Sequence, residues 1–369
     1  MDYMKVSIGS RIVEGPWGGG NLFAINLRDY LIKKGHKVVF DLAHSDIDLI
    51  LLTDPRSKKE SSSTFNHIDI LKYKNLVNPN VSVVQRVNEC DERKNTNNIN
   101  QLYLEASNVS DHVIFVSSWL REIYLNLGLK KEKTSVILAG SNKAIFNDKN
   151  GLNWNGKEKL KIVTHHWSSH ENKGFKVYKE LDNLLEKKEW SEKIQFSYIG
   201  NLPHNFEFKN SIKIQPLHGA RLANKLKENH IYITASQNEP SGNHHIEAAQ
   251  CGLPIMYLKS GGIPEYCKGF GVELLDLEET INKITSEYKF YKKELKKYPF
   301  NSEEMCEQFL EIFETIDLEN KNSWINFPIS LNGKLYLINN FIRKYINFSN
   351  FLNDIKSRIK KVIIKKNES

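Results

Sequence analysis

The amino-acid sequence predicts an α/β protein with two Rossmann-like, doubly wound parallel-sheet domains that face a cleft, followed by a C-terminal helical tail. Three observations support this prediction. The chain has 369 residues, about twice the size of an ordinary domain. In each half, apolar runs alternate with amphipathic helical patterns, as they do in parallel βαβ units. A polar stretch in the middle interrupts this alternation, which then restarts.

The first half, residues 1–147, contains six apolar runs that we expect to be strands: KVSIG, HKVVFDL, DLILLT, VSVVQRV, HVIFVS and TSVIL. After the first run, the apolar residues of NLFAINLRDYLIKKG recur at mostly helical spacing, and Gly35 ends that helix. Helical patterns are also clear in NINQLYLEASNVS and SWLREIYLNLG. We therefore assign residues 1–147 to a first Rossmann-like domain.

Residues 148–159 form the expected linker, and residues 160–300 the second domain. Its expected strands are LKIVTHH, IQFSYIG, SIKIQPL, IYITAS, LPIMYL and GVELLD. Residues 301–318 read as a closing amphipathic helix, and residues 319–369 as a basic tail. Open parallel sheets bind ligands beyond the carboxyl ends of their strands, so two such sheets place a site in the cleft between them.

Composition excludes several classes of protein. The net charge of +8 comes mainly from the tail: residues 331–369 hold nine Lys or Arg against two acids, which leaves the first 330 residues at +1 and gives no sign of nucleic-acid binding. The four cysteines are far apart, as expected in a reducing compartment. We find neither a secretory signal nor an apolar run long enough to span a bilayer, so we expect a cytoplasmic protein.

The segment GPWGGGN, Gly15–Asn21, lies between a strand and a helix, where glycines let the backbone approach a ligand. It is not a dinucleotide fingerprint. G-x-G-x-x-G would need glycine at position 23 or 17, which are Phe23 and Trp17. By itself, such a turn is as often structural as functional.

The stretch EPSGNHHIEAAQCGLPI, which begins at Glu239, is the strongest candidate for a site. Glu239 falls in a loop at the carboxyl end of a strand, and Gly242 permits a tight turn. A helix then begins, so its first backbone amides point toward the cleft, and Glu247 lies within its first turns. A carboxylate in this position suits the two hydroxyls of a ribose.

The spacing argues against a metal site. His244 and His245 are adjacent, so on a helix they point about 100° apart, and His165 and His166 have the same defect. H-E-x-x-H is absent. We expect no metal and no cofactor. A plainer interpretation is that the glutamates only stabilise the helix N-terminus, but this explains one glutamate more easily than two.

Together, E-P-S-G-x-x-x-x-E-A, C-G-L-P and G-G-I-P-E (Gly261–Glu265) resemble the E-x7-E signature of retaining nucleotide-sugar glycosyltransferases of the GT-B fold, specifically glycosyltransferase family 4. The segments GGGNLFAINLRDYLIKKGHKVV, VIFVSSWLREIY, ILAGSNKAIF and NKGF also resemble elements of that family. The resemblance covers residues 4 to 318.

The resemblance implies that the donor is a UDP-sugar or GDP-sugar. Glu247 would hold the ribose, and Glu239 would face the donor sugar. Lys173 would stabilise the diphosphate as it leaves. The other donor-binding candidates are Gly242 with the amides of Asn243, His244 and His245, and, on the opposite wall, Gly19 and Gly20.

Two departures from the family pattern concern the site. The arginine that usually precedes Lys173 is missing, and we expect His165, His166 or His170 to replace it in part. The side chains of positions 243–245 are more polar than usual, which fits either an unusual donor sugar or a site that uses only the backbone.

The first domain would bind the acceptor. Its fourth strand ends in QRVNECDER, so Arg86, Asn88 and Glu89, with His166 from the second domain, are candidates to contact acceptor or donor sugar. Asp91 and Arg93 are expected to form a surface ion pair. The family implies retention of configuration by front-face displacement. In this mechanism most of the catalysis comes from positioning the substrates and from electrostatic stabilisation of the leaving diphosphate.

In the tail, apolar residues at positions 338, 341, 342, 345, 348, 352, 355, 359 and 362 form a helical stripe backed by Lys and Arg. This pattern predicts binding to an anionic membrane surface, on the inner face, or packing against protein. The sequence leaves four other functions open: an epimerase or a phosphorylase of the same fold, a non-catalytic sugar-nucleotide binder, and, with less support, an NAD-dependent oxidoreductase.

Overall fold

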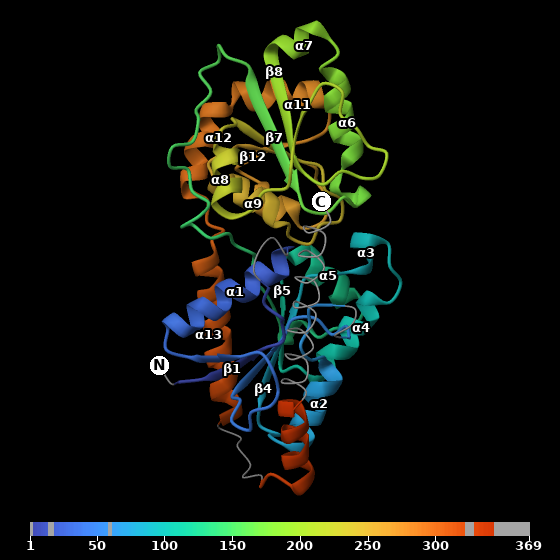
Figure 1. Cartoon of the computed structure of the whole chain (residues 1–369), viewed down its shortest axis with the longest axis vertical. Helices are drawn as coiled ribbons and strands as arrows, with labels where there is room; N and C mark the ends of the chain where they lie inside the picture. Colours follow the sequence, from blue (N-terminus) through green and yellow to red (C-terminus); the bar gives the residue numbers. More distant parts are fainter. Residues whose placement is uncertain (1–2, 14–17, 58–60, 322–327, 343–369) are drawn as a thin grey trace, which may run out of the picture.

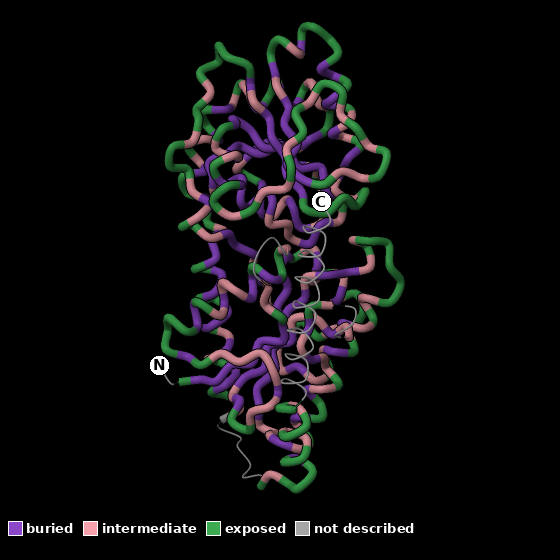
Figure 2. Tube along the Cα trace, viewed as in Figure 1, coloured by how far each residue is buried: buried purple, intermediate pink, exposed green. Residues whose placement is uncertain are grey.

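A computed structural model describes residues 3–13, 18–57, 61–321 and 328–342. The described chain forms two α/β lobes, each built around a six-stranded parallel sheet (Figure 1). Buried residues concentrate in the two sheets and on the helix faces that cover them (Figure 2). The predicted fold class is confirmed.

The N-terminal sheet has the strand order β2-β1-β3-β4-β5-β6. Its strands are β1 (Lys5–Ile8), β2 (Lys37–Val39), β3 (Leu49–Leu52), β4 (Ser82–Val87), β5 (His112–Phe115) and β6 (Thr134–Val136). The helices between them are α1 (Gly18–Lys33), α2 (His67–Leu76), α3 (Asp91–Lys94), α4 (Ile99–Ala106) and α5 (Ser118–Asn126). β3 and β4 are buried along their whole length because helices cover both faces of the sheet.

The C-terminal sheet has the order β12-β11-β10-β7-β8-β9. Its strands are β7 (Leu160–His166), β8 (Ile194–Gly200), β9 (Ile212–Ile214), β10 (Ile231–Thr234), β11 (Ile255–Tyr257) and β12 (Gly271–Glu273). Its helices are α6 (Phe175–Leu184), α7 (Lys188–Lys193), α8 (Gly219–Lys227), α9 (Asn243–Gln250), α10 (Ile263–Cys267), α11 (Leu277–Ser286) and α12 (Tyr288–Glu294).

Both sheets are doubly wound, so each has a point where the direction of strand addition reverses. In the C-terminal sheet this point lies between β7 and β10, which pair in parallel from Ile231 with Ile162. Their carboxyl ends carry His165 and His166 on one side and lead to the Glu239 loop on the other. Ligands bind at such switch points in open α/β sheets. The fold therefore places the candidate segment where a ligand is expected.

The chain crosses twice between the domains, and the two crossings touch. Ser141 and Asn301 form a parallel bridge, and the amide of Ser302 donates to the carbonyl of Ser141 at 2.8 Å. A Cβ on Gly140 would lie 2.1 Å from the backbone of Asn301, so only glycine fits there. The crossings are thus locked together by backbone contact.

The helix α13 (Ser302–Lys321) returns to the N-terminal domain and passes the expected boundary at residue 318. It packs along α1, and the rings of Phe23 and Phe309 lie 5.0 Å apart (Figure 1). Phe309 and Phe313 are buried in the same core as β1 and β3. This helix therefore belongs to the N-terminal core, although the second domain precedes it in the sequence.

Residues 331–342 form one more helix, which lies against α2. The Tyr336 hydroxyl donates to the carbonyl of Asp69 at 3.1 Å, and a Cβ on Gly333 would lie 2.1 Å from the carbonyl oxygen of Leu76. The positions of the predicted apolar stripe from 345 onward lie outside the described residues.

Candidate active site

The loop after β10 brings Glu239 to the edge of its domain that faces the N-terminal domain. Asn238 and Gly242 both have positive φ, of 49° and 81°, which turns the chain sharply before α9 begins. Gly261 and Gly262 pack against the backbone of this loop, and the amide of Gly262 donates to the carbonyl of Glu239 at 2.9 Å. The G-G-I-P-E segment therefore supports the Glu239 loop.

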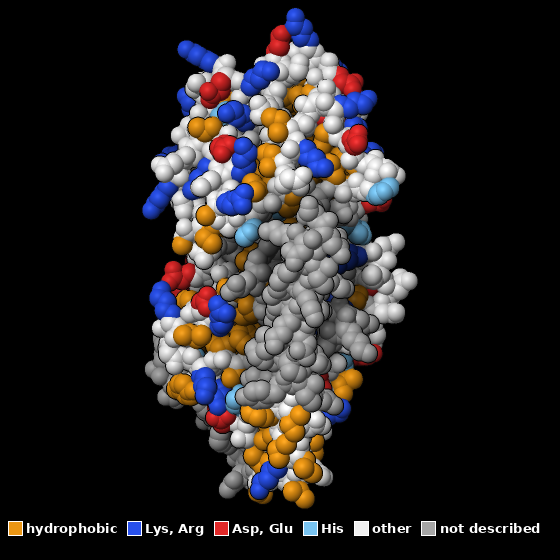
Figure 3. Space-filling view, viewed as in Figure 1, with side chains coloured by type: hydrophobic (Ala, Val, Ile, Leu, Met, Phe, Trp, Pro, Cys, Tyr) orange, Lys and Arg blue, Asp and Glu red, His pale blue; other side chains and the backbone are white. Residues whose placement is uncertain are grey.

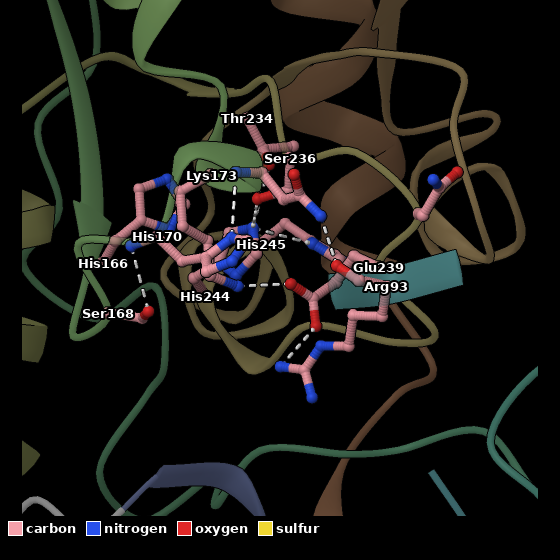
Figure 4. A network of polar contacts seen from close by, with 12 residues as sticks. Arg93, His166, Ser168, His170, Lys173, Thr234, Ser236, Glu239, His244 and His245 are labelled. Atoms are coloured by element: carbon pink, nitrogen blue, oxygen red, sulfur yellow. Dashed lines mark hydrogen bonds and ion pairs between the residues drawn. The ribbon is translucent and has the colours of Figure 1, made fainter. Parts of the chain in front are cut away.

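The Glu239 carboxylate is only 6% exposed and lies between two cations (Figure 4). One oxygen pairs with the ammonium of Lys173, and the other lies 3.2 Å from the guanidinium of Arg93. Burial by itself would raise the pKa of Glu239, but Lys173 and Arg93 hold it well below its ordinary value. The carboxylate is therefore ionised at neutral pH.

Lys173 is positioned by a turn that needs glycine. It ends a short 3₁₀ turn, Glu171–Lys173, and Gly174 follows with φ of 86°. A Cβ on Gly174 would lie 2.2 Å from the carbonyl oxygen of Ala235, so glycine is required for this contact. The amide of Gln237 donates to the carbonyl of Asn172 at 2.7 Å, which ties the Lys173 turn to the Glu239 loop.

Glu247 lies on α9 and is 6% exposed. Its Oε2 lies 2.9 Å from Nε2 of His165, at the end of β7. The imidazole therefore orients this carboxylate. The two glutamates have different partners, as two groups with different tasks would.

Three further histidines cluster behind these carboxylates. The rings of His166 and His244 lie 4.6 Å apart, and those of His244 and His245 lie 4.9 Å apart. His166 is bonded to the Tyr178 hydroxyl at 2.7 Å, and His244 to the Thr234 hydroxyl at 2.8 Å. Burial lowers the pKa of all three imidazoles, that of His245 to about 3.

These imidazoles are therefore neutral at pH 7. Among the described residues, no three His, Cys, Asp or Glu side chains are grouped so that they could hold a metal ion.

On the N-terminal side, α1 begins at Gly18 and brings its first turn to the other domain. A Cβ on Gly19 would lie 3.2 Å from the side-chain amide nitrogen of Asn243, so these two candidates from opposite domains meet. The space next to Gly20 is open. The side-chain oxygen of Asn21 accepts from the amide of Val13 at 2.9 Å, which links α1 to the chain that follows β1. The positions from Gly15 to Trp17 lie outside the described residues.

The acceptor-side candidates differ in their surroundings. Arg86 is 5% exposed, with its guanidinium 4.0 Å from the centre of the Phe23 ring. Glu89 is buried, and its Oε2 pairs with Arg93 at 3.1 Å, while its Oε1 has no hydrogen-bond partner among the described residues. Asn88 is half-buried. His166 lies apart from these residues in the strand order, on β7 of the C-terminal sheet.

Arg93 is the residue that the sequence interpretation misplaced. Asp91 does not pair with it in the described structure. Asp91 instead accepts from the amides of Ile99 and Asn100 at 2.9 and 3.0 Å and so fixes the start of α4. Arg93 pairs with Glu89 and, across the domains, with Glu239. Nothing local in the sequence indicates this contact, because the partner lies in the other domain.

The comparisons with known proteins concern the fold of this chain. No family model matches the chain, and no curated protein matches it. Solved structures do match. A sucrose-phosphate synthase from Thermosynechococcus elongatus gives a TM-score of 0.58 at 15% identity, over 86% of this chain and 100% of the other. The fold is GT-B.

Two further GT-B structures agree. A glycosyltransferase from Rickettsia africae gives a TM-score of 0.63 at 16% identity, over 86% of this chain and 99% of the other. HepE from Anabaena, in complex with UDP and glucose, gives a TM-score of 0.60 at 13% identity, over 85% of this chain and 100% of the other. At such low identity the likeness establishes the GT-B fold and leaves the activity to be argued from the site.

Proposed function

We propose that this protein is a retaining glycosyltransferase of family 4 that transfers a hexose from a UDP-sugar or GDP-sugar to a glycan or glycolipid. The observation that carries the proposal is the pair of buried carboxylates, Glu239 and Glu247, with Lys173 beside the first, at the switch point of a GT-B domain. Similar GT-B structures hold UDP with glucose, or ADP with acarbose.

In this proposal Glu247, oriented by His165, accepts from the ribose hydroxyls. The sugar hydroxyls bind Glu239, and the diphosphate binds Lys173. Gly242 and the first amides of α9, from Asn243 to His245, also face the donor. Gly19 and Gly20 form the opposite wall.

The acceptor lies on the N-terminal side. Arg86, Asn88 and Glu89 are its proposed contacts, and the unpartnered Oε1 of Glu89 is free to accept from a hydroxyl. His166 stays a candidate on the sugar side. The bond between the anomeric carbon and the diphosphate oxygen breaks as the bond to the acceptor oxygen forms on the same face, and the acceptor proton passes to the diphosphate. The residues named supply placement and charge and need no metal.

Thermal-shift measurements with UDP, GDP, their sugars and NAD test the class. We expect stabilisation by a nucleotide or its sugar and none by NAD; stabilisation by NAD alone would favour an oxidoreductase.

Glu247→Ala should abolish donor hydrolysis or transfer because the ribose hydroxyls lose their hydrogen-bond acceptor. Activity unchanged in that variant would contradict the proposal. A donor that is bound but never turned over would indicate a sugar-nucleotide binder, and sugar isomerisation or phosphorolysis would indicate one of the other enzymes.

We also propose that the C-terminal segment attaches the enzyme to an anionic membrane surface. One face of the helix 331–342 packs on α2, while Leu331, Leu335 and Ile338 are exposed by 73%, 54% and 55%. Hydrophobic side chains gather at this end of the molecule (Figure 3). Most of the nine basic residues of the tail follow this helix in the sequence. No helix in the described part of the chain is long and apolar enough to cross a bilayer.

Vesicle sedimentation tests this attachment. Because Tyr336 and Leu337 pack on the N-terminal core, the shortened chain for comparison ends at Ile342 and keeps this packing. We expect the full chain to sediment with anionic vesicles and not with zwitterionic ones, and the shortened chain to lose most of this binding. Equal binding of the two chains would contradict the proposal.

A further inference from the structure

The diphosphate site that the sequence suggests lacks one cation. A diphosphate carries at least two negative charges, and Lys173 has one positive charge. The segment before Lys173, HHWSSHEN, contains no arginine. The three histidines that we expected to compensate do not fill this role in the structure.

Each of these histidines is occupied elsewhere. His165 lies against Glu247, and His166 is buried against Tyr178 as a neutral imidazole. His170 is exposed, and its Nδ1 accepts from the amide of Asn172, which closes the turn. The missing charge must therefore come from another part of the chain.

Arg93 has the position that this charge requires. Its guanidinium and the ammonium of Lys173 lie against the two oxygens of one carboxylate, that of Glu239 (Figure 4). Both cations are largely buried: the Arg93 side chain is 27% exposed and that of Lys173 is 14% exposed. A ligand that binds the ammonium of Lys173 can therefore also contact the guanidinium of Arg93.

The backbone of α3 is fixed to the two loops that form the site. The side-chain amide of Asn172, next to Lys173, donates to the carbonyl of Arg93. The side-chain amide of Asn238, next to Glu239, donates to the carbonyl of Glu92 at 3.0 Å. Asn95, in the left-handed conformation, ends the short helix. Arg93 is therefore built into the site from the opposite domain.

The charges agree with this placement. In the structure, the positive charges of Lys173 and Arg93 are balanced by the carboxylates of Glu239 and Glu89. When Glu239 turns to the hydroxyls of a sugar, the two cations lose a shared partner, and a diphosphate replaces it. A guanidinium offers five donors in a fork that matches phosphate oxygens, and among the described residues the Arg93 side chain pairs with Glu89 and Glu239.

We propose that Arg93, carried by the N-terminal domain, supplies the second cation for the diphosphate of the donor. The inference rests on the proposed nucleotide-sugar function and goes beyond it. It makes the diphosphate site a joint product of both domains, complete only when they are in contact.

Calorimetric titration with a nucleoside diphosphate and the matching monophosphate tests this inference. UDP with UMP, GDP with GMP and ADP with AMP are the pairs, and the pair that the wild type binds is used. We expect Arg93→Gln to weaken diphosphate binding about 10- to 100-fold, the range for a charged hydrogen bond, and to change monophosphate binding by less than about threefold. Arg93→Lys should fall between the wild type and Arg93→Gln.

Lys94→Ala is the matched control. It removes a positive charge from the next residue, whose ammonium lies 3.6 Å from Glu89 and has no contact with Glu239. Its preference for diphosphate over monophosphate should match the wild type. Glu247→Ala should weaken both nucleotides alike because it acts on the ribose.

If Arg93 only holds the domains together, Arg93→Gln will weaken both nucleotides equally or neither, and the inference is wrong while the proposed function stands. If the wild type binds none of the three diphosphates, the proposed function fails and the inference fails with it. Either result is clear from the same titrations.

Discussion

The two domains contribute to the candidate site in different ways. On the C-terminal side, Glu239, Gly242, Asn243 and Glu247 lie within one loop and the first turns of one helix. On the N-terminal side, Gly19 comes from the segment after β1, and Glu89 and Arg93 come from the segment after β4. The C-terminal wall is a local motif with backbone support, whereas the N-terminal wall is assembled by the tertiary fold. The two walls meet at the contacts of Arg93 with Glu239 and of Gly19 with Asn243.

The largest expected effect comes from Glu239, where both walls act on one side chain. Glu239→Gln keeps the size of the side chain and removes its charge. We expect the rate of sugar transfer or donor hydrolysis, as kcat/KM, to fall about 100- to 1000-fold, because Lys173 and Arg93 lose their shared anion and the sugar hydroxyls lose a charged hydrogen-bond acceptor. Steady-state kinetics with the donor that stabilises the wild type measures this change.

Asp182 provides the matched control for a buried carboxylate without a role between the domains. It is fully buried on α6, where the backbone amides of Lys209, Asn210 and Ser211 donate to it at 2.9 Å. Asp182→Asn should lower the free energy of unfolding by about 1 to 3 kcal/mol and leave kcat/KM near that of the wild type. If both variants lose activity to the same degree, Glu239 has no special role.

The second prediction concerns pH and the C-terminal wall alone. The folded-state pKa of His245 is about 3, below the ordinary 6.5, because the ring is buried; Glu239 opposes this shift, while Lys173 and His165 add to it. Since the unfolded chain binds this proton more readily, the stabilisation is complete above about pH 6.5 and is lost as the pH falls toward 3. His245 alone contributes up to about 1.4 kcal/mol per pH unit in this window.

Urea denaturation at several pH values between 5 and 7 measures that slope. His245→Leu should reduce it by up to about 1.4 kcal/mol per unit, because an apolar side chain binds no proton in either state. Asn243→Leu, on the same helix, is the control and should keep the wild-type slope. Parallel pH dependence of the wild type and His245→Leu would contradict the assignment.

The smallest effect is expected where one domain caps a helix of the other. The Glu265 carboxylate accepts from the amides of Ser118 and Trp119, at 2.8 and 3.0 Å, and so closes the start of α5. Glu265→Ala should lower the free energy of unfolding by about 1 kcal/mol, the usual cost of a lost cap, and leave nucleotide binding unchanged. Urea denaturation measures the free energy of unfolding, and calorimetric titration measures nucleotide binding. A loss of nucleotide affinity would show that this contact also shapes the site.

Much of the fold could be predicted because its signals are local. Each strand of the C-terminal sheet corresponds to an apolar run in the sequence, and both sheets are parallel and doubly wound as expected. The sequence also predicts the loop position of Glu239, the turn at Gly242 and the start of α9, because Pro240, Gly242 and the following helical pattern act within a few residues. The packing of α13 in the N-terminal core could not be predicted in the same way, because α13 is buried against α1 at the other end of the chain.

The sequence by itself thus determined two parallel-sheet domains and the acidic loop-and-helix motif, because periodicity and turn chemistry are properties of neighbouring residues. Only the tertiary structure decided what that motif contacts. It paired His165 with Glu247, buried three histidines in the neutral state and brought Arg93 from the opposite domain to Glu239. Charge and burial depend on everything within a few ångströms, and the contacting residues Arg93 and Glu239 lie 146 positions apart in the chain (239 − 93).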